Sequence, residues 1–169
     1  MFLFIAAILL ALCVSFVCSL CEATLLSLTP SQVADLTQRH PKIGARWQAF
    51  KGAITQPIAA ILILNTLAHT VGATVAGAQF ENVFGKEWII LFSLVFTYLV
   101  LQLSEILPKT LGVAYNRPLA VYMATPLTLL VRLMQPVIYL VHKVNRIFEG
   151  KERPADGPQT LEEISALAG

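Results

Sequence analysis

Three apolar stretches of the sequence carry polar side chains at helical spacing, and these side chains could together bind a metal ion. The stretches are "SFVCSLCEATLLSL", "ILILNTLAH" and "LQLSEILPKT". Within each stretch the polar residues are three or four positions apart, which puts them on one face of a helix. The residues are Ser15, Ser19 and Glu22 in the first stretch, Asn65 and His69 in the second, and Gln102 and Glu105 in the third.

Oxygen ligands of this kind favour particular metal ions. Hydroxyl, amide and carboxylate oxygens are hard ligands, which suit magnesium, calcium or sodium better than copper or zinc. One or two carboxylates with neutral oxygens best match magnesium. The backbone carbonyl of Ser104 is a further candidate oxygen. Its partner in a regular helix would be the N–H of residue 108, and Pro108 has none. His69 and Cys21 would suit a softer metal, so a zinc site is the less favoured alternative.

The composition places these stretches in a membrane. Of the 169 residues, 56% are hydrophobic and only 13% are charged, which is too apolar for a soluble domain of this length. Three runs are long enough to cross a bilayer, which takes about 20 helical residues; they cover residues 2–28, 56–80 and 88–115. The first run is not expected to be a signal peptide, because it lacks a basic start and contains Glu22.

The distribution of basic residues predicts the orientation of these spans. The loop after the first span contains Arg39, Lys42, Arg46 and Lys51, whereas the loop after the second contains only Lys86. Lys and Arg are enriched in cytoplasmic loops. We therefore expect the N-terminus outside the cell and everything after the third span in the cytoplasm.

With this orientation, the candidate ligands of the three spans lie at one depth. Ser19, Asn65 and Glu105 are each eight or nine residues from the expected inner end of their span. At 1.5 Å per residue this is roughly 12–14 Å from the inner boundary. An ionisable side chain within a span usually faces a cavity or a partner. Lys109 is expected either to extend to the interface or to pair with Glu105.

The segments on the cytoplasmic side are also predicted to be helical. Thr29 and Pro30 form a helix-start signal, and Pro41 ends that short helix, so that a second one over residues 42–54 completes a hairpin. Residues 118–148 are apolar but contain Arg132 and two internal prolines. A fourth span would also place several basic residues outside. We therefore predict a bent juxtamembrane helix along the inner interface.

The sequence changes character after residue 150. Residues 151–169 begin with a charged stretch rich in proline and glycine, and then start a new helix near Thr160. These residues are predicted to be a linker and the beginning of a cytoplasmic domain, so that residues 1–150 form the transmembrane domain.

Small residues within the spans are predicted to serve helix packing. Cys13, Cys18 and Cys21 all lie in the first apolar run, where a disulfide framework is not expected, and they are interpreted as small apolar residues. Gly72 and Gly77 in the second span are interpreted as part of a helix-packing surface.

The three stretches, in this order and with a helical hairpin between the first two, resemble the transmembrane domain of the CorC/CNNM family of magnesium transporters. The resemblance covers about residues 1–150. It implies a homodimer with three spans per subunit, a juxtamembrane helical belt and an inward-open cation cavity. It also implies a following cytoplasmic pair of CBS domains, through which alone a nucleotide would bind.

The resemblance carries the family's ligands onto Ser15, Ser19, Asn65 and Glu105, with Glu22 at an acidic position often seen in bacterial members. His69 departs from the pattern, since a second asparagine often stands there. Two further departures are Leu64, where the family often has glycine, and Leu20, where it often has a small residue. The supporting positions of the site are Glu22, His69, Gln102, Ser104, Pro108 and Lys109.

The predicted function is magnesium transport across the plasma membrane, as export by alternating access, with sodium as a counter-ion implied by the family. Membrane lipid is an expected partner, and nucleic acid is not, because twelve Lys and Arg against ten Asp and Glu form no basic stripe. No enzymatic activity is expected. The alternatives are a membrane scaffold or regulatory subunit that binds a partner transporter, and an intramembrane hydrolase that uses Cys21 or Ser19 with His69.

Overall fold

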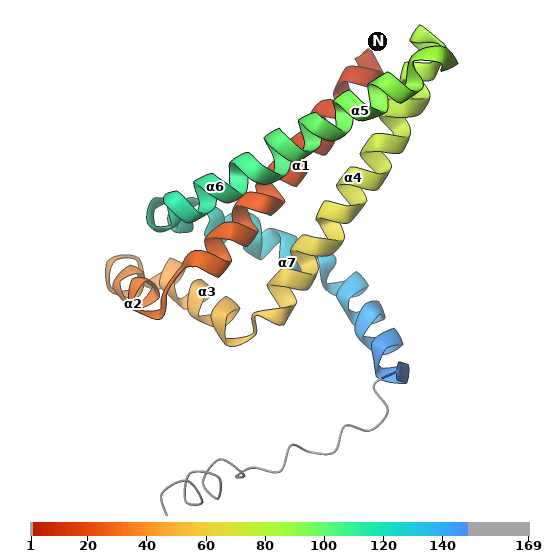
Figure 1. Ribbon diagram of the computed structural model, residues 1–169. Coiled ribbons are helices and arrows are strands. Elements are labelled where there is room, and N and C mark those ends of the chain that lie inside the picture. Colours follow the sequence, from red (N-terminus) through yellow and green to blue (C-terminus); the bar gives the residue numbers. More distant parts are fainter. Residues whose placement is uncertain (1, 149–169) are drawn as a thin grey trace, which may run out of the picture. The chain divides into compact units, whose positions relative to one another are not determined.

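The computed structural model describes residues 2–148, and every regular element within them is helical. Three long helical segments dominate the chain (Figure 1). They are α1 (Phe2–Ser27), α4 (Thr55–Phe84), and a third segment built from η1 (Lys86–Trp88), α5 (Ile89–Leu99), η2 (Val100–Ile106) and α6 (Leu107–Ala114). Two short helices, α2 (Pro30–Arg39) and α3 (Pro41–Gly52), lie between α1 and α4, and α7 (Asn116–Phe148) follows.

The chain divides into two compact units, and the first ends at Ile138. The second unit starts at Tyr139, and only the last residues of α7 are described in it. The packing and the site discussed below all belong to the first unit.

Helix α1 lies at the centre of the first unit, because it packs along both α4 and the η2–α6 part of the third segment. Two glycines permit these close approaches. A methyl group on Gly72 of α4 would collide with Ala11, and one on Gly112 of α6 would collide with Ala23 of α1. Gly72 thus confirms the predicted packing surface, whereas Gly77 has no neighbour within 4 Å of such a methyl group.

The two short helices form a hairpin at the end of the bundle where α1 stops, called the hairpin end below. Thr29 and Gln32 form a capping box at the start of α2, because each side chain bonds the backbone of the other. Trp47 of α3 is fully buried and donates a hydrogen bond from Nε1 to the carbonyl of Ala120, at 2.9 Å. This hydrogen bond and the burial of Trp47 hold the hairpin against the first turns of α7.

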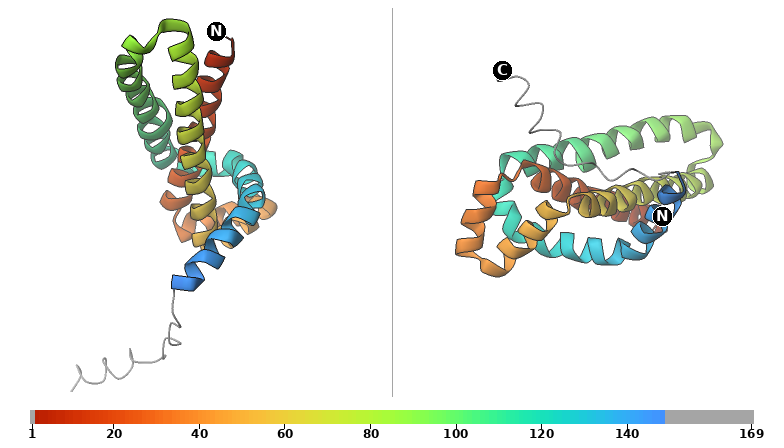
Figure 2. Two further views of the ribbon diagram at one scale, coloured as in Figure 1. Left: turned by 90° about the vertical axis from the view of Figure 1, so that its right-hand side faces the viewer. Right: turned by 90° about the horizontal axis from the view of Figure 1, so that it is seen from below.

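Helix α7 presents one buried stripe to this core. Up to Ile138, its buried residues are three or four positions apart, the spacing of one helix face: Ala120, Ala124, Leu127, Leu130, Met134 and Ile138. Pro126 and Pro136 stand inside the helix without ending it. This part of α7 crosses the hairpin ends of the long helices steeply rather than lying beside them (Figure 2).

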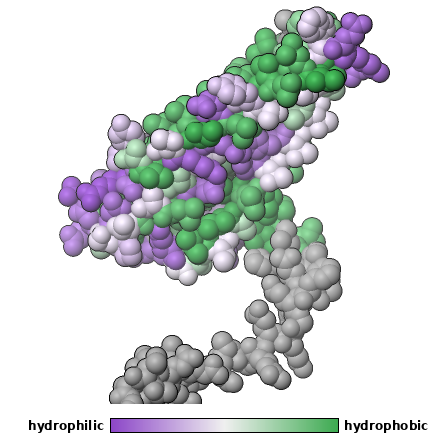
Figure 3. Space-filling model, in the orientation of Figure 1, coloured by the Kyte–Doolittle hydropathy of each residue, from purple (hydrophilic) through white to green (hydrophobic). Residues whose placement is uncertain are grey.

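The surface of the long helices is apolar over much of its area (Figure 3), and large hydrophobic side chains such as Leu62, Ile90 and Leu94 are exposed. Within residues 2–148, four helices are long and apolar enough to cross a membrane. They are Phe4–Ser27, Thr55–Phe84, Lys86–Ala114 and Asn116–Leu140. Exposed apolar helices of this length are typical of a membrane protein, in which the apolar surface contacts lipid.

The all-helical fold class expected from the sequence is confirmed. The three predicted spans correspond to α1, α4 and the third segment, with α4 extending to Phe84 instead of residue 80. The predicted juxtamembrane helix corresponds to α7, which length and composition alone would also allow to span. The predicted linker and domain start at residues 151–169 lie outside the described residues.

Candidate cation site

The third long segment changes from α-helix to π-helix over Val100–Ile106, and this change builds one wall of the site. In it the N–H of Leu107 bonds to the carbonyl of Gln102, five residues earlier. The next bond of this π pattern would need an N–H on residue 108. Proline has no N–H, so the π segment ends before Pro108. Short π segments inside helices are frequent at functional sites. Here the segment contains Glu105 and ends just before Pro108.

Ser15 of α1 is the hub of the site. Its Oγ lies 2.6 Å from Oδ1 of Asn65 and 2.7 Å from Nε2 of His69, both on α4. It also lies 3.5 Å from the backbone oxygen of Ser104 in the π segment. Ser15 is only 1% exposed, so these groups meet inside the bundle. One serine thus joins polar groups from all three long segments.

The protons of this cluster can be assigned from its geometry. A serine hydroxyl has one hydrogen, and Ser15 donates it to Oδ1 of Asn65. In the tautomer that completes this network, His69 carries its proton on Nε2 and donates it to Oγ of Ser15. The same Nε2 lies 3.5 Å from Oε1 of Glu105, so the imidazole N–H also faces the carboxylate. In this state His69 bonds one predicted metal ligand, Ser15, and faces a second, Glu105.

This arrangement is not that of a serine hydrolase. A catalytic triad needs the serine on one imidazole nitrogen and the carboxylate on the other. Ser15 and Glu105 both face Nε2 of His69. A hydrolase would also need a hydrogen bond from Ser19 or Cys21 to His69. Neither bond occurs among the described residues. Cys21 instead lies 3.8 Å from the sulfur of Met123.

Ser19 is the second predicted serine ligand, and the structure places it differently from the sequence-based expectation. Counting residues put Ser19 level with Asn65, but it is Ser15, one turn earlier on α1, that contacts Asn65. Ser19 is fully buried, and within residues 2–148 its Oγ has no hydrogen-bond partner. A buried hydroxyl without a partner costs about 1–3 kcal/mol. The hydroxyl of Ser19 therefore has no competing hydrogen bond among the described residues.

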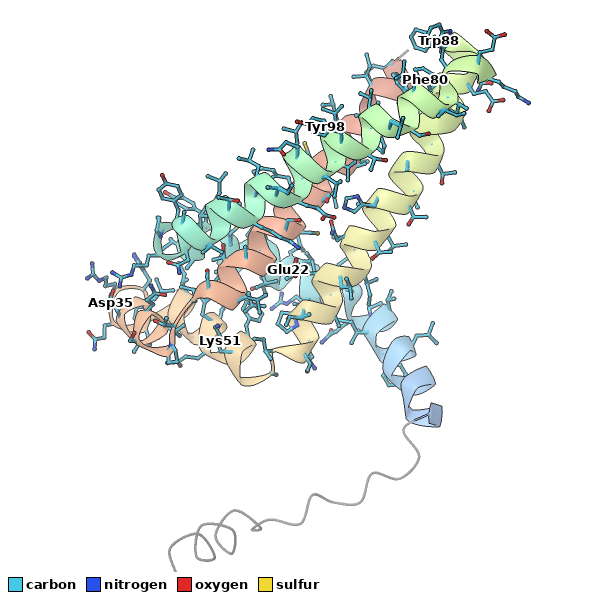
Figure 4. All side chains as sticks on the ribbon, in the orientation of Figure 1. Glu22, Asp35, Lys51, Phe80, Trp88 and Tyr98 are labelled. Atoms are coloured by element: carbon cyan, nitrogen blue, oxygen red, sulfur yellow. The ribbon has the colours of Figure 1, made fainter. Side chains whose placement is uncertain are left out.

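Lys109 also has a partner other than the one considered from the sequence. Its Nζ lies 3.3 Å from Oε2 of Glu22 on α1, so the pairing with Glu105 is wrong. Glu105 faces α4 through His69, whereas Lys109, four residues later, faces α1. Glu22 lies in the half of α1 nearer the hairpin (Figure 4), so this ion pair is closer to the hairpin end than the Ser15 cluster.

Gln102 does not join the cluster. It is exposed, and the structure gives its side chain no hydrogen bond among the described residues. In an α-helix, the step of three residues from Gln102 to Glu105 would put both side chains on one face. Because a π turn closes over five residues, a step of three stops well short of a full turn.

The cluster combines several oxygen atoms with one imidazole nitrogen, that of His69. Among the described residues, no group of three or more His, Cys, Asp and Glu side chains is placed to hold a metal ion. The oxygens that converge come from one carboxylate, one amide, one hydroxyl and one backbone carbonyl, with the Ser19 hydroxyl one turn away on α1. Cys18 and Cys21 are buried free thiols, as predicted, while Cys13 is exposed.

Fold and site together define a helical membrane domain in which three long helical segments meet at the buried Ser15. The family model "Cyclin M transmembrane N-terminal domain" matches residues 5–168, so the chain belongs to the CNNM family. The UPF0053 protein sll1254 of Synechocystis sp. (strain ATCC 27184 / PCC 6803 / Kazusa) is 30% identical over 164 residues, covering 96% of this chain and 47% of that protein.

A second relative is the DUF21 domain-containing protein At1g55930, chloroplastic, of Arabidopsis thaliana. It is 26% identical over 133 residues, covering 79% of this chain and 20% of that protein. The chain thus spans about half the length of the first relative and about a fifth of the second.

Proposed function

We propose that this chain is the membrane domain of a magnesium transporter, and that Ser15, Ser19, Asn65 and Glu105 bind the ion. The observation that carries the proposal is the meeting of three spans at Ser15, whose Oγ lies within 3.5 Å of Asn65, His69 and Ser104 atoms. Oxygen ligands with a single carboxylate suit magnesium. Membership of the CNNM family supports a role in divalent cation transport.

In the proposed mechanism, the residues replace waters of the hydrated ion. Glu105 supplies the negative charge, and the oxygens of Ser15, Ser19 and Asn65 take the place of neutral ligands. A protonated Nε2 cannot coordinate a cation, so His69 either turns away from Ser15 and Glu105 or carries its proton on Nδ1 when the ion enters. Magnesium loses its waters reluctantly, so the ligands must already be held in place. The contacts of Ser15 with two neighbouring segments provide that order.

We further propose three membrane crossings, by α1, α4 and the η1–α6 segment, with α7 along the inner interface. The steep crossing of α7 and the exposed Arg132 in its middle support this topology. The basic residues of the α2–α3 hairpin support a cytoplasmic hairpin and an external N-terminus. The location proposed is the plasma (inner) membrane.

The family resemblance supports the remaining elements of the proposal. The working unit is a homodimer, with a nucleotide-binding CBS pair following this domain. Transport proceeds as export by alternating access, and sodium serves as the counter-ion.

The test is magnesium-dependent thermal stabilisation of the purified chain. A ligand that binds only the folded state adds about 2.7 kcal/mol at a hundredfold excess over its dissociation constant. We expect stabilisation of the wild type by magnesium, and loss of it in Glu105→Gln and Asn65→Ala. The matched control is Glu87→Gln, which removes the same charge from η1 at the opposite end of the bundle. Calcium and sodium chloride control for ion type and ionic strength.

The same experiment separates the transporter from the second candidate. A scaffold or regulatory subunit would keep its fold without a cation site, so that all variants would respond to magnesium alike or none would respond. That result would mean that a partner protein, and not this chain, transports the ion. If the site variants alone lose the response, magnesium flux into liposomes containing the chain is measured next.

A further inference from the structure

A second polar feature lies away from the Ser15 cluster, at the hairpin end. A partly open hollow of about 230 Å³ lies between α2 and the first turns of α7. Its walls combine apolar and basic side chains. The apolar residues include Leu28, Leu36 and Val121, and the basic ones are Arg39, His40 and Arg117. An apolar floor with a basic rim suits an amphiphilic anion.

The charge of the rim is only partly neutralised. Asp35 also lines the hollow, and its Oδ1 accepts a hydrogen bond from Nε of Arg39 at 3.0 Å. Arg117 forms no salt bridge with any side chain that the structure describes, a set that excludes residues 1 and 3 and residues from 141 onward. It is also in the first turn of α7, which has no acidic residue. A cation there adds to the positive end of the helix dipole, and a bound anion relieves this repulsion.

The basic surface continues beyond the hollow. A neighbouring hollow at the tip of the hairpin is lined by Arg39, His40, Lys42 and Arg46. Hydrophilic residues accordingly dominate the surface over α2 (Figure 3). Arg46 donates from Nη1 to Oγ1 of Thr125, so it is anchored to α7.

The position of the hollow identifies the class of anion. Leu28 directly follows Ser27, the last residue of α1. Asn116 at the start of α7 donates from Nδ2 to the carbonyl of Ser27, at 3.1 Å. The hollow is therefore at the level where the first span ends, which is the level of the lipid headgroups. An ion from solution would need no apolar floor there.

We infer that this hollow binds the headgroup of an anionic phospholipid, with its phosphate between Arg39 and Arg117 and its glycerol end on Leu28 and Leu36. Guanidinium groups match phosphate oxygens in a two-pronged geometry. The inference rests on the proposed position of the hairpin at the membrane surface, but not on the cation site. It makes the hairpin and α7 a lipid-dependent clamp next to the ends of the spans.

The test measures lipid selectivity of the whole chain in phosphatidylcholine nanodiscs that contain spin-labelled phosphatidylglycerol. Each basic side chain near an anionic headgroup contributes a factor of about five in affinity. We expect Arg39→Gln and Arg117→Gln each to lower the preference for phosphatidylglycerol by about this factor. Lys42→Gln, which removes the same charge from the neighbouring hollow, should leave the preference nearly unchanged. Arg117→Lys, which keeps the charge but not the two-pronged geometry, should recover part of the preference.

Several outcomes would overturn the inference. Equal losses in all three glutamine variants would mean diffuse attraction to the basic tip, and no loss in any would mean no site. Displacement of the lipid by excess inorganic phosphate would identify a soluble anion as the ligand. If Arg117→Lys recovered no preference for phosphatidylglycerol, the loss seen in Arg117→Gln would be due to disturbed packing and not to the lost charge. Magnesium-dependent stabilisation, measured on the same samples, reports separately on the cation site.

Discussion

Replacing Ser19 by alanine should change stability and cation binding in opposite directions. Ser19 is fully buried and its hydroxyl has no partner within residues 2–148. An unsatisfied buried hydroxyl costs about 1–3 kcal/mol. Alanine keeps the Cβ and loses a single oxygen atom, so the cavity left behind is small. We therefore expect Ser19→Ala to stabilise the cation-free chain by about 1 kcal/mol.

The same variant should bind magnesium more weakly. If the Ser19 hydroxyl replaces one water of the ion, its loss removes one ligand, and a loss of about 1.4 kcal/mol corresponds to a tenfold weaker dissociation constant. The stabilisation curve should then shift to about tenfold higher magnesium concentration. Unfolding is followed by heat or denaturant in detergent, first in the presence of a chelator and then across a magnesium titration.

Two serine variants serve as comparisons. Ser15→Ala removes the hydroxyl that bonds Asn65 and His69, so it should destabilise the cation-free chain by about 1 kcal/mol. Ser93→Ala removes an exposed hydroxyl that bonds the backbone of its own helix, and it should alter neither property. A Ser19→Ala chain that is less stable without cation, or that binds magnesium as the wild type does, would refute the assignment of Ser19 as a waiting ligand.

Three further substitutions test the packing and the inner ion pair. Trp47→Phe loses the buried hydrogen bond to the Ala120 carbonyl and should cost about 1–2 kcal/mol of stability, measured by thermal unfolding; an unchanged midpoint would contradict the contact. Gly72→Val should separate α1 from α4 and destabilise the chain by about 1–3 kcal/mol in the same assay; an unchanged midpoint would contradict the close contact with Ala11. Lys109→Glu should weaken magnesium-independent stability, and adding Glu22→Lys should restore it; absence of rescue would argue against the pair.

Much of the site could be anticipated from local spacing. Asn65 and His69 are four residues apart on a helix, and both do reach Ser15. The proline at position 108 marked the place where the regular hydrogen-bond ladder stops, and the π segment ends just before it. The pattern of a glutamate three residues before a proline was the available signal for that segment, but an α-helical step was assumed.

The depth of α1 relative to its neighbours could not be read from the sequence. The end of a span is located from sequence only to within about 2–4 residues, which is the difference between Ser15 and Ser19 as the partner of Asn65. The relative height of the helices depends on where small residues let them approach. Gly72 fits against Ala11 and Gly112 against Ala23, and these two contacts fix α1 against α4 and α6.

The sequence by itself determined the helical class, the apolar spans, the hairpin between them and the residue types of the site. These features follow from hydrophobic length, periodicity and helix-start signals, all of which are local. Tertiary structure alone decided that Lys109 pairs with Glu22, that Gln102 faces outward and that His69 lies between Ser15 and Glu105. These contacts depend on the rotation and height of packed helices, which are set by interactions between residues far apart in the chain.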